Sequence, residues 1–144
     1  MTINSVNNCQ IINLKKIENR RGNLTPVENG IDIPFDVERV YYLYDVPGGE
    51  TRGGHAHKDL QQFIVAVAGS FDVILDDGVE RKTIKMNRSS YGLFVPKMIW
   101  REIVNFSTGA ICLVLASLPY MEEEYLRSFD KFIELKKATE DLVT

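Results

Sequence analysis

Residues 49–69 have the sequence GETRGGHAHKDLQQFIVAVAG and contain both histidines of the protein, His55 and His57. In a β-strand, residues i and i+2 point to the same face, so we expect the two imidazoles to face one space. A proline-glycine-glycine turn at 47–49 precedes them, and residues 62–68 are apolar on both faces, as in a strand covered on two sides. The unperturbed pKa of histidine lies near neutrality, so a pair on one face favours metal binding or proton transfer.

Composition limits the class of protein. With 144 residues and a net charge of -3, the chain is expected to form one domain with a real core and to have no general attraction to nucleic acid or anionic membranes. No apolar run has membrane-spanning length and the N-terminus has no leader pattern, so we expect a cytoplasmic protein. Cys9 and Cys112 lie far apart in apolar surroundings, which predicts buried thiols rather than a disulfide.

Short β-branched and aromatic runs alternate with turn residues along most of the chain. They predict strands at 9–14, 39–44, 62–68, 71–75, 79–85, 91–95, 100–105 and 110–116. The Asp-Asp-Gly sequence at 76–78 is a strong hairpin signal, whereas Pro34 excludes 32–36 from a central strand. This spacing predicts an all-β sandwich or barrel.

The C-terminal region differs. Residues 121–137 begin with three glutamates and end with two lysines, which suits the dipole of a helix over this range. Leu126, Phe129 and Ile133 have helical spacing and form an apolar stripe. We expect this stripe to pack against the barrel rather than to bind a partner.

The spacing of the histidine stretch resembles the first motif of the cupin superfamily, which is carried here by Gly49, His55, His57, Gln62 and Gly69. Residues 96–105, PKMIWREIVN, resemble the second cupin motif. The resemblance implies a cupin-type antiparallel β-barrel, or jelly roll, with a short C-terminal helix.

Three positions depart from the cupin pattern. Gln62 replaces the usual glutamate, Arg101 replaces the metal-binding histidine, and Met98 replaces a glycine. Cupin metal sites typically use three histidines and one glutamate. Arginine carries a permanent positive charge and cannot ligate a cation, and glutamine is a weak neutral ligand. We therefore expect no catalytic metal and no cofactor.

Further blocks resemble one family within the cupins, the dTDP-4-keto-6-deoxyhexose 3,4-ketoisomerases. They are Arg21-Gly22, RVYY at 39–42, TRGGHAHK at 51–58, and FVP at 94–96 ahead of Trp100, and the resemblance covers about residues 8–136. It implies a dTDP-linked 4-keto-6-deoxyglucose substrate and a homodimer with exchanged N-terminal strands. The 3-keto product would pass to an aminotransferase for 3-amino-3,6-dideoxysugars of a surface polysaccharide, such as lipopolysaccharide O-antigen, or of an antibiotic.

The residues fit this reaction. Moving a carbonyl from C4 to C3 requires removal of the C3 proton, an enediolate, and delivery of a proton to C4. By resemblance His55 is the principal base, and His57 orients it or shuttles the second proton. Tyr41 could polarise the ketone or donate the proton, although it could equally be a core aromatic. Tyr42 and Tyr44 point to the other face by parity.

Cations are expected to bind the anionic part of the substrate. Arg52 is our first choice for the diphosphate, with Lys58 and Arg39 as weaker candidates. Arg21 and Arg101 are expected to line the sugar site. Trp100 could stack on thymine, although core packing is favoured.

The resemblance also bears on the product. Arg21 resembles the enzymes that give the galacto product and Arg101 resembles those that give the gluco product. The two positions disagree, and Arg101 tips the balance to the gluco product because it lies closer to the histidine motif.

Three alternatives remain open at this stage. The first is a dTDP-sugar 3,5-epimerase, which is also a barrel with a histidine base. The second is a non-catalytic sugar-binding cupin, in which replacement of His55 by asparagine would leave binding intact. The third is a metal dioxygenase, which elemental analysis of the purified protein would reveal.

Overall fold

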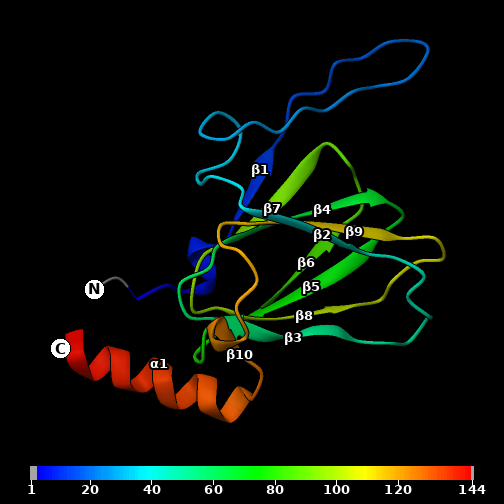
Figure 1. Ribbon diagram of the computed structural model, residues 1–144. Helices are drawn as coiled ribbons and strands as arrows, with labels where there is room; N and C mark the ends of the chain where they lie inside the picture. The colour runs from blue at the N-terminus through cyan, green and yellow to red at the C-terminus, as the bar shows by residue number, and fades with distance from the viewer. Residues whose placement is uncertain (1–2, 144) are drawn as a thin grey trace.

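The computed structural model describes residues 3–143 and consists mainly of two five-stranded antiparallel sheets (Figure 1). The first sheet has the order β1-β7-β4-β9-β2, with the bounds β1 Gln10–Asn13, β7 Tyr91–Val95, β4 Gln62–Ala68, β9 Ile111–Ala116 and β2 Arg39–Leu43. The second has the order β10-β3-β8-β5-β6, with the bounds β10 Tyr125–Leu126, β3 Arg52–His57, β8 Trp100–Val104, β5 Phe71–Asp76 and β6 Arg81–Met86. Two short 3-10 turns, η1 Val6–Asn8 and η2 Glu122–Glu124, and the helix α1 Phe129–Val143 complete the fold. The expected all-β class with a C-terminal helix is confirmed.

The main core lies between the two sheets. Alternate residues of each strand point inward, as the period of two requires. The inward apolar side chains form one cluster of buried residues that includes Ile64, Val73, Leu93, Ile103 and Val114. This cluster holds the sheets together and gives the site described below a rigid frame.

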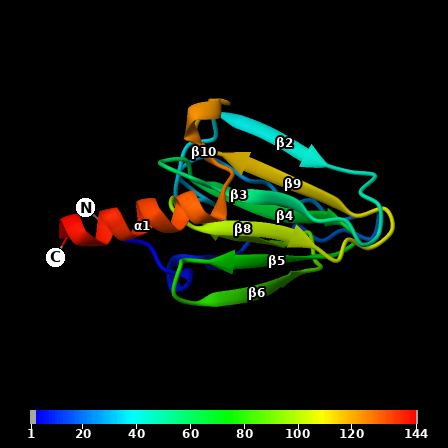
Figure 2. The ribbon, with the colours of Figure 1, turned by 90° about the horizontal axis from the view of Figure 1, so that it is seen from below.

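Both sheets are also covered on part of their outer faces, which explains why β4 is apolar on both faces from residue 63 to residue 68. Over the first sheet, the segment between β1 and β2 packs Ile33 and Leu14 against Phe63, Val65 and Leu115 (Figure 1). Over the second sheet, α1 lies beside β3 and β8 (Figure 2). There Phe132 packs on Ala56 and Trp100.

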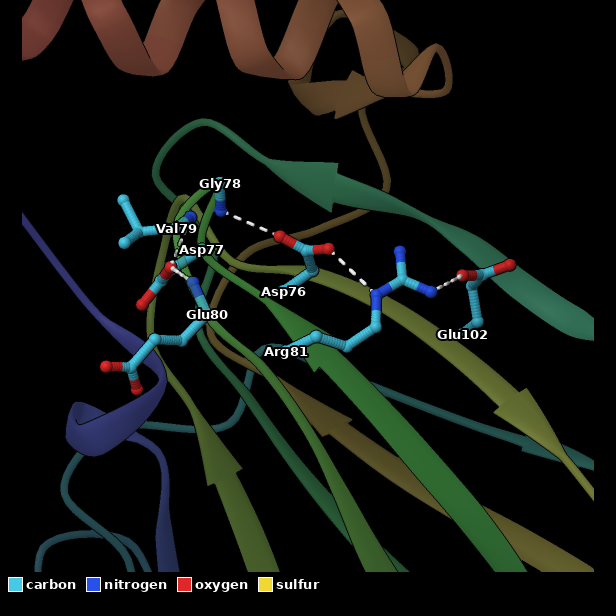
Figure 3. A network of polar contacts seen from close by, with 7 residues as sticks. All are labelled: Asp76, Asp77, Gly78, Val79, Glu80, Arg81 and Glu102. Atoms are coloured by element: carbon cyan, nitrogen blue, oxygen red, sulfur yellow. Dashed lines mark hydrogen bonds and ion pairs between the residues drawn. The ribbon is translucent and has the colours of Figure 1, made fainter.

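The β5–β6 connection is the hairpin that the Asp-Asp-Gly sequence predicts. Asp77 Oδ1 accepts hydrogen bonds from the backbone N–H groups of Val79 and Glu80, both at 2.8 Å (Figure 3). Its Oδ2 accepts from the buried N–H of Val6, also at 2.8 Å. This second bond ties the N-terminal segment to the hairpin. Because Val79 and Glu80 belong to the turn, β6 begins two residues later than expected.

Arg81, the first residue of β6, anchors the same hairpin on the outside of the sheet. Its guanidinium lies between Asp76, at 2.9 Å, and Glu102, at 3.9 Å (Figure 3). The side chain of Arg81 is about half exposed, so these ion pairs contribute little to stability.

The prediction of one helix over residues 121–137 is wrong at both ends. Tyr125 and Leu126 are extended and pair with His57 and Ala56 of β3, so the preceding glutamates form only the turn η2. α1 starts after Ser128, whose Oγ accepts from the N–H of Lys131, and it continues beyond the two lysines because no glycine or proline stops it. Packing of its apolar stripe against the barrel is confirmed.

Two further expectations concern the cysteines and membranes. Cys9 and Cys112 are both free thiols, and burial raises the pKa of each to about 12. Within residues 3–143, no helix is both long and apolar enough to cross a membrane.

Candidate functional site

His55 and His57 lie side by side on the inner face of β3, as the spacing predicts. They are 7% and 4% exposed. Their ring centroids are 4.7 Å apart and the rings meet edge to face. Ala56 between them points outward to the helix, so strand geometry alone places both imidazoles between the sheets.

Arg101 lies at the centre of this group. It is directly opposite His55 on the neighbouring strand β8 and is only 1% exposed. Its Nη2 lies 2.6 Å from His55 Nε2 and 3.4 Å from His57 Nε2, and it donates to Tyr41 Oη at 3.3 Å. Because a guanidinium only donates hydrogen bonds, the Nε2 atoms that face it act as acceptors.

The first sheet supplies the other side of the site. Gln62 of β4 and Tyr41 of β2 both point inward, and Gln62 Nε2 lies 3.2 Å from Tyr41 Oη and 3.2 Å from His57 Nε2. Several buried polar atoms here have no hydrogen-bond partner among the described residues: His57 Nδ1, Gln62 Oε1, and Arg101 Nε and Nη1. Buried polar atoms are normally paired. These atoms can therefore hydrogen-bond to the polar groups of a small molecule.

Both imidazoles are neutral at physiological pH. Burial, and then the positive charge of Arg101, lower the pKa of His55 from 6.5 to about 2. The same two causes, in the same order, lower the pKa of His57 even further. The charged imidazolium is disfavoured because it would be poorly solvated and would face a cation. A neutral imidazole is the form that can accept a proton.

Tyr125 belongs to the site although the sequence suggests a helical packing residue. Its ring lies 4.9 Å from His55 and 4.5 Å from His57 between centroids. Arg39 Nη2 donates to Tyr125 Oη at 3.0 Å, which joins the edge strand β2 of the first sheet to the edge strand β10 of the second. Only the pairing of β10 with β3 brings Tyr125 here, and the sequence gives no signal for a strand of two residues.

Arg39 lies beside the same group of residues. It is therefore closer to the site than expected for a residue that the sequence indicates only as a weaker candidate for substrate binding. Its guanidinium lies 4.7 Å from the centroid of the Tyr41 ring and 5.0 Å from that of the Tyr120 ring. Cation–π contacts of this kind hold the group in place. Its Nη1 is buried and has no hydrogen-bond partner in the described part of the chain.

The remaining predicted residues lie outside this cluster. Arg52 and Lys58 are exposed at the two ends of β3, and Arg21 is exposed in the segment between β1 and β2. Trp100 points to the outer face, where its ring contacts Phe129 edge to face at 5.3 Å. The structure therefore brings together the three predicted catalytic residues and Arg101. Trp100 instead packs against the C-terminal helix on the outer face of the sheet.

The donor set does not fit a cupin-type metal ion. Within residues 3–143, no group of three or more histidine, cysteine, aspartate or glutamate side chains is close enough to hold one. At the positions of the cupin ligands the chain offers two imidazoles, the amide of Gln62 and the guanidinium of Arg101. This set contains no anionic ligand and includes a fixed cation 2.6 Å from His55 Nε2.

Comparisons with known proteins agree on one family. Residues 7–137 match the family described as FdtA: WxcM-like, C-terminal. Over 123 residues, 85% of this chain and 88% of the relative, the sequence is 44% identical to TDP-4-oxo-6-deoxy-alpha-D-glucose-3,4-oxoisomerase from Aneurinibacillus thermoaerophilus.

Solved structures lead to the same group. A 3,4-ketoisomerase from Helicobacter canadensis is 43% identical, with a TM-score of 0.88 over 90% of this chain and 97% of that one. A histidine-to-asparagine mutant of the 3,4-ketoisomerase QdtA from Thermoanaerobacterium thermosaccharolyticum, in complex with TDP-4-keto-6-deoxyglucose, is 41% identical. Its TM-score is 0.89 over 91% of this chain and 95% of that one.

Proposed function

The chain belongs to the FdtA, WxcM-like family, and we propose that it is a 3,4-ketoisomerase that converts TDP-4-keto-6-deoxyglucose to a TDP-3-keto-6-deoxyhexose. The observation that carries the proposal is the buried pair of neutral histidines in contact with Arg101. The identity of the relatives supports the substrate class. The 3-keto product is the natural precursor of a 3-amino-3,6-dideoxysugar, since an aminotransferase requires a ketone at C3.

The reaction exchanges two protons and no electrons leave the sugar. The C4 ketone acidifies the C3 proton, and a neutral imidazole removes it to give an enediolate. A proton is then delivered to C4. The C3 hydroxyl loses its proton as the new carbonyl forms, and the C4 oxygen takes up a proton to become the hydroxyl of the product. His55 is the principal base and His57 orients it or carries the second proton. Tyr41 Oη polarises the ketone oxygen.

Arg101 stabilises the negative charge that develops on the substrate during the reaction. Negative charge develops on the ketone oxygen as the C3 proton leaves, and a buried guanidinium with two unpaired donor atoms stabilises it without reorganisation. The same positive charge also disfavours the imidazolium. The developing enediolate offsets that charge, so the imidazole becomes more basic as the reaction needs it.

The remaining contacts and the assembly are proposals. Arg52 binds the diphosphate from the rim of the barrel, with Lys58 and Arg39 as weaker candidates for this contact. Arg21 reaches the sugar site from the segment between β1 and β2. Trp100 supports β8 through packing instead of stacking on thymine. Because Arg101 touches His55 and Arg21 does not, we favour the gluco product.

We also propose a cytoplasmic homodimer with exchanged N-terminal strands. Within one chain β1 pairs with β7, and exchange would put the partner's strand in this place. Apolar side chains that are about half exposed on β1 and the following segment, at Ile11, Ile17 and Leu24, support burial against a second copy. The molar mass in solution, measured by light scattering, tests this part.

The reaction is tested by proton NMR of the purified protein with TDP-4-keto-6-deoxyglucose in D2O. We expect a 3-keto product with deuterium at C4. In a parallel reaction in H2O, where C4 keeps a proton, the coupling constant between H4 and H5 gives the configuration at C4. His55→Asn should lower kcat by about 10²–10⁴-fold, the usual share of a general base. Tyr42→Phe, on the opposite face of β2, should leave kcat unchanged.

Two results would contradict the proposal. Deuterium at C5 without a 3-keto product would indicate an epimerase. Absence of turnover by the wild-type protein, with substrate binding unchanged in His55→Asn, would indicate a sugar-binding protein. Stoichiometric iron, nickel or zinc in elemental analysis would contradict the expectation of a metal-free site.

A further inference from the structure

Lys136 is an unusually buried lysine. It lies on the barrel side of α1 and is 4% exposed, although lysines are almost never fully buried. Its Nζ donates to two backbone carbonyl groups, that of Asn4 at 2.5 Å and that of Met98 at 2.7 Å. The ammonium also lies 5.9 Å from the centroid of the Phe132 ring. Lys136 therefore fastens α1 to the turn between β7 and β8.

That turn is strained at Met98. Its φ is 60°, in the left-handed region that side chains other than glycine seldom occupy. The cupin motif described above has a glycine at this position, so the chain keeps the turn without the residue that fits it best. A second element must hold the backbone of Met98 in place, and the hydrogen bond from Lys136 to its carbonyl does so.

The turn at Met98 also holds the C-terminal end of β3. The N–H of Met98 donates to the carbonyl oxygen of His57 at 2.8 Å. One peptide unit on each side of Met98 thus links the ammonium of Lys136 to the backbone of His57. His57 is the last residue of β3. It pairs with Tyr125 of β10 on one side, and the N–H of Met98 holds its carbonyl group on the side of β8.

We infer that Lys136 is a positioning residue for His57, which acts through the left-handed turn at Met98. The inference rests on the proposed function only for its kinetic readout. It gives the C-terminal helix a part in setting the geometry of the site, in addition to covering the apolar face of β3 and β8 (Figure 2).

The first test compares Lys136→Met with Lys137→Met. The first substitution keeps the length and packing of the side chain but removes the ammonium. The second changes an exposed lysine on the same helix. We expect Lys136→Met to lower kcat roughly tenfold to a hundredfold with little change in KM, because misplacement of a reacting group by about 1 Å has effects of this size. Lys137→Met should leave both unchanged.

The second test separates positioning from general destabilisation. Glycine adopts a φ of 60° without strain, so in a Met98→Gly background the loss caused by Lys136→Met should fall to about threefold or less. A loss of the same factor in both backgrounds would overturn the inference. So would a lower melting temperature with kcat unchanged.

The third readout does not depend on turnover. The protein has two histidines, so the imidazole Cε1–H signals are resolved by NMR. Lys136→Met should move the His57 signal more than that of His55, and unmoved signals would refute positioning. If the wild-type protein makes no 3-keto product, the proposed function fails while this readout still decides the role of Lys136.

Discussion

Replacement of Arg101 by methionine should make both histidines more basic. Methionine fills a similar volume with an apolar side chain, so burial of the imidazoles is kept while the charge 2.6 Å from His55 Nε2 is removed. A unit charge about 4 Å away contributes about 4 kcal/mol at an effective dielectric constant of about 20. Since about 1.4 kcal/mol corresponds to one pH unit, this charge can lower the pKa of an imidazole by up to about three.

In this variant the pKa of His55 should nevertheless stay below that of an ordinary histidine. Burial is the largest cause of the low pKa of His55 and Arg101 comes second, so the largest single cause remains in the variant. We therefore expect the pKa of His55 to rise by about one to three from its value of about 2. It should stay below 6.5.

The assay is an NMR titration of the imidazole Cε1–H signals from about pH 4 to about pH 9, assigned with His55→Asn and His57→Asn. In the wild-type protein neither signal should titrate in this range. In Arg101→Met the His55 signal should begin to move at the acidic end. Arg52→Met, which removes an exposed arginine, is the matched control and should behave like the wild type. A wild-type midpoint near 6.5, or identical curves with and without Arg101, would refute the electrostatic account.

Three further changes test the fold and the site. Gly92→Ala would place its Cβ against the ring of Phe63, well inside van der Waals contact. Overpacking should therefore cost about 1–3 kcal/mol in urea unfolding, and an unchanged midpoint would show that the ring moves freely. In Asp77, burial raises the pKa, but hydrogen bonds from the backbone N–H groups, including that of Val6, lower it below its usual value. The carboxylate therefore stabilises the protein above the usual pKa of aspartate and loses this effect as the pH falls through the lowered value. Asp77→Asn should cost about 1–3 kcal/mol near pH 7 and less near pH 3, and a cost independent of pH would contradict this. Tyr125→Phe keeps the ring against both histidines and removes the hydroxyl that accepts from the neighbouring arginine; we expect KM to rise severalfold with kcat within about twofold, and the opposite pattern would assign the hydroxyl a chemical role.

The sequence predicts the inner face of the site well because strand periodicity decides it. The spacing of His55 and His57 requires a shared face in any strand, and the cupin-like spacing places Gln62 and Arg101 on strands that reach the same interior. Parity also separates Tyr41 from Tyr42, and the structure has Tyr42 exposed. These inferences need only local geometry and the order of strands.

The same reasoning fails where long-range pairing overrides local preference. The residues around Tyr125 have the charge pattern of a helix start, but two hydrogen-bonded pairs with β3 make them extended. The sequence favours Arg39 only weakly because two of its contacts, with the ring of Tyr120 and the hydroxyl of Tyr125, are made to a segment far away in the sequence. Lys136 is a residue expected near the end of a helix. The local sequence does not show that it is buried and that its ammonium donates to two backbone carbonyl groups.

Gln62 and Arg101, two of the three departures from the cupin pattern, together change the distribution of charge in the site. A metal cupin holds its cation with neutral imidazoles and one carboxylate, so its positive charge can dissociate. Here the cation is the guanidinium of Arg101, which is covalently part of β8. The neutral amide of Gln62 stands at the position of the carboxylate that would neutralise it. A carboxylate at position 62 would pair with the guanidinium, raise the pKa of both imidazoles and repel an enediolate. An amide at that position leaves the positive charge of Arg101 unpaired in the interior, where it favours an anion in the transition state more than a neutral ketone in the ground state.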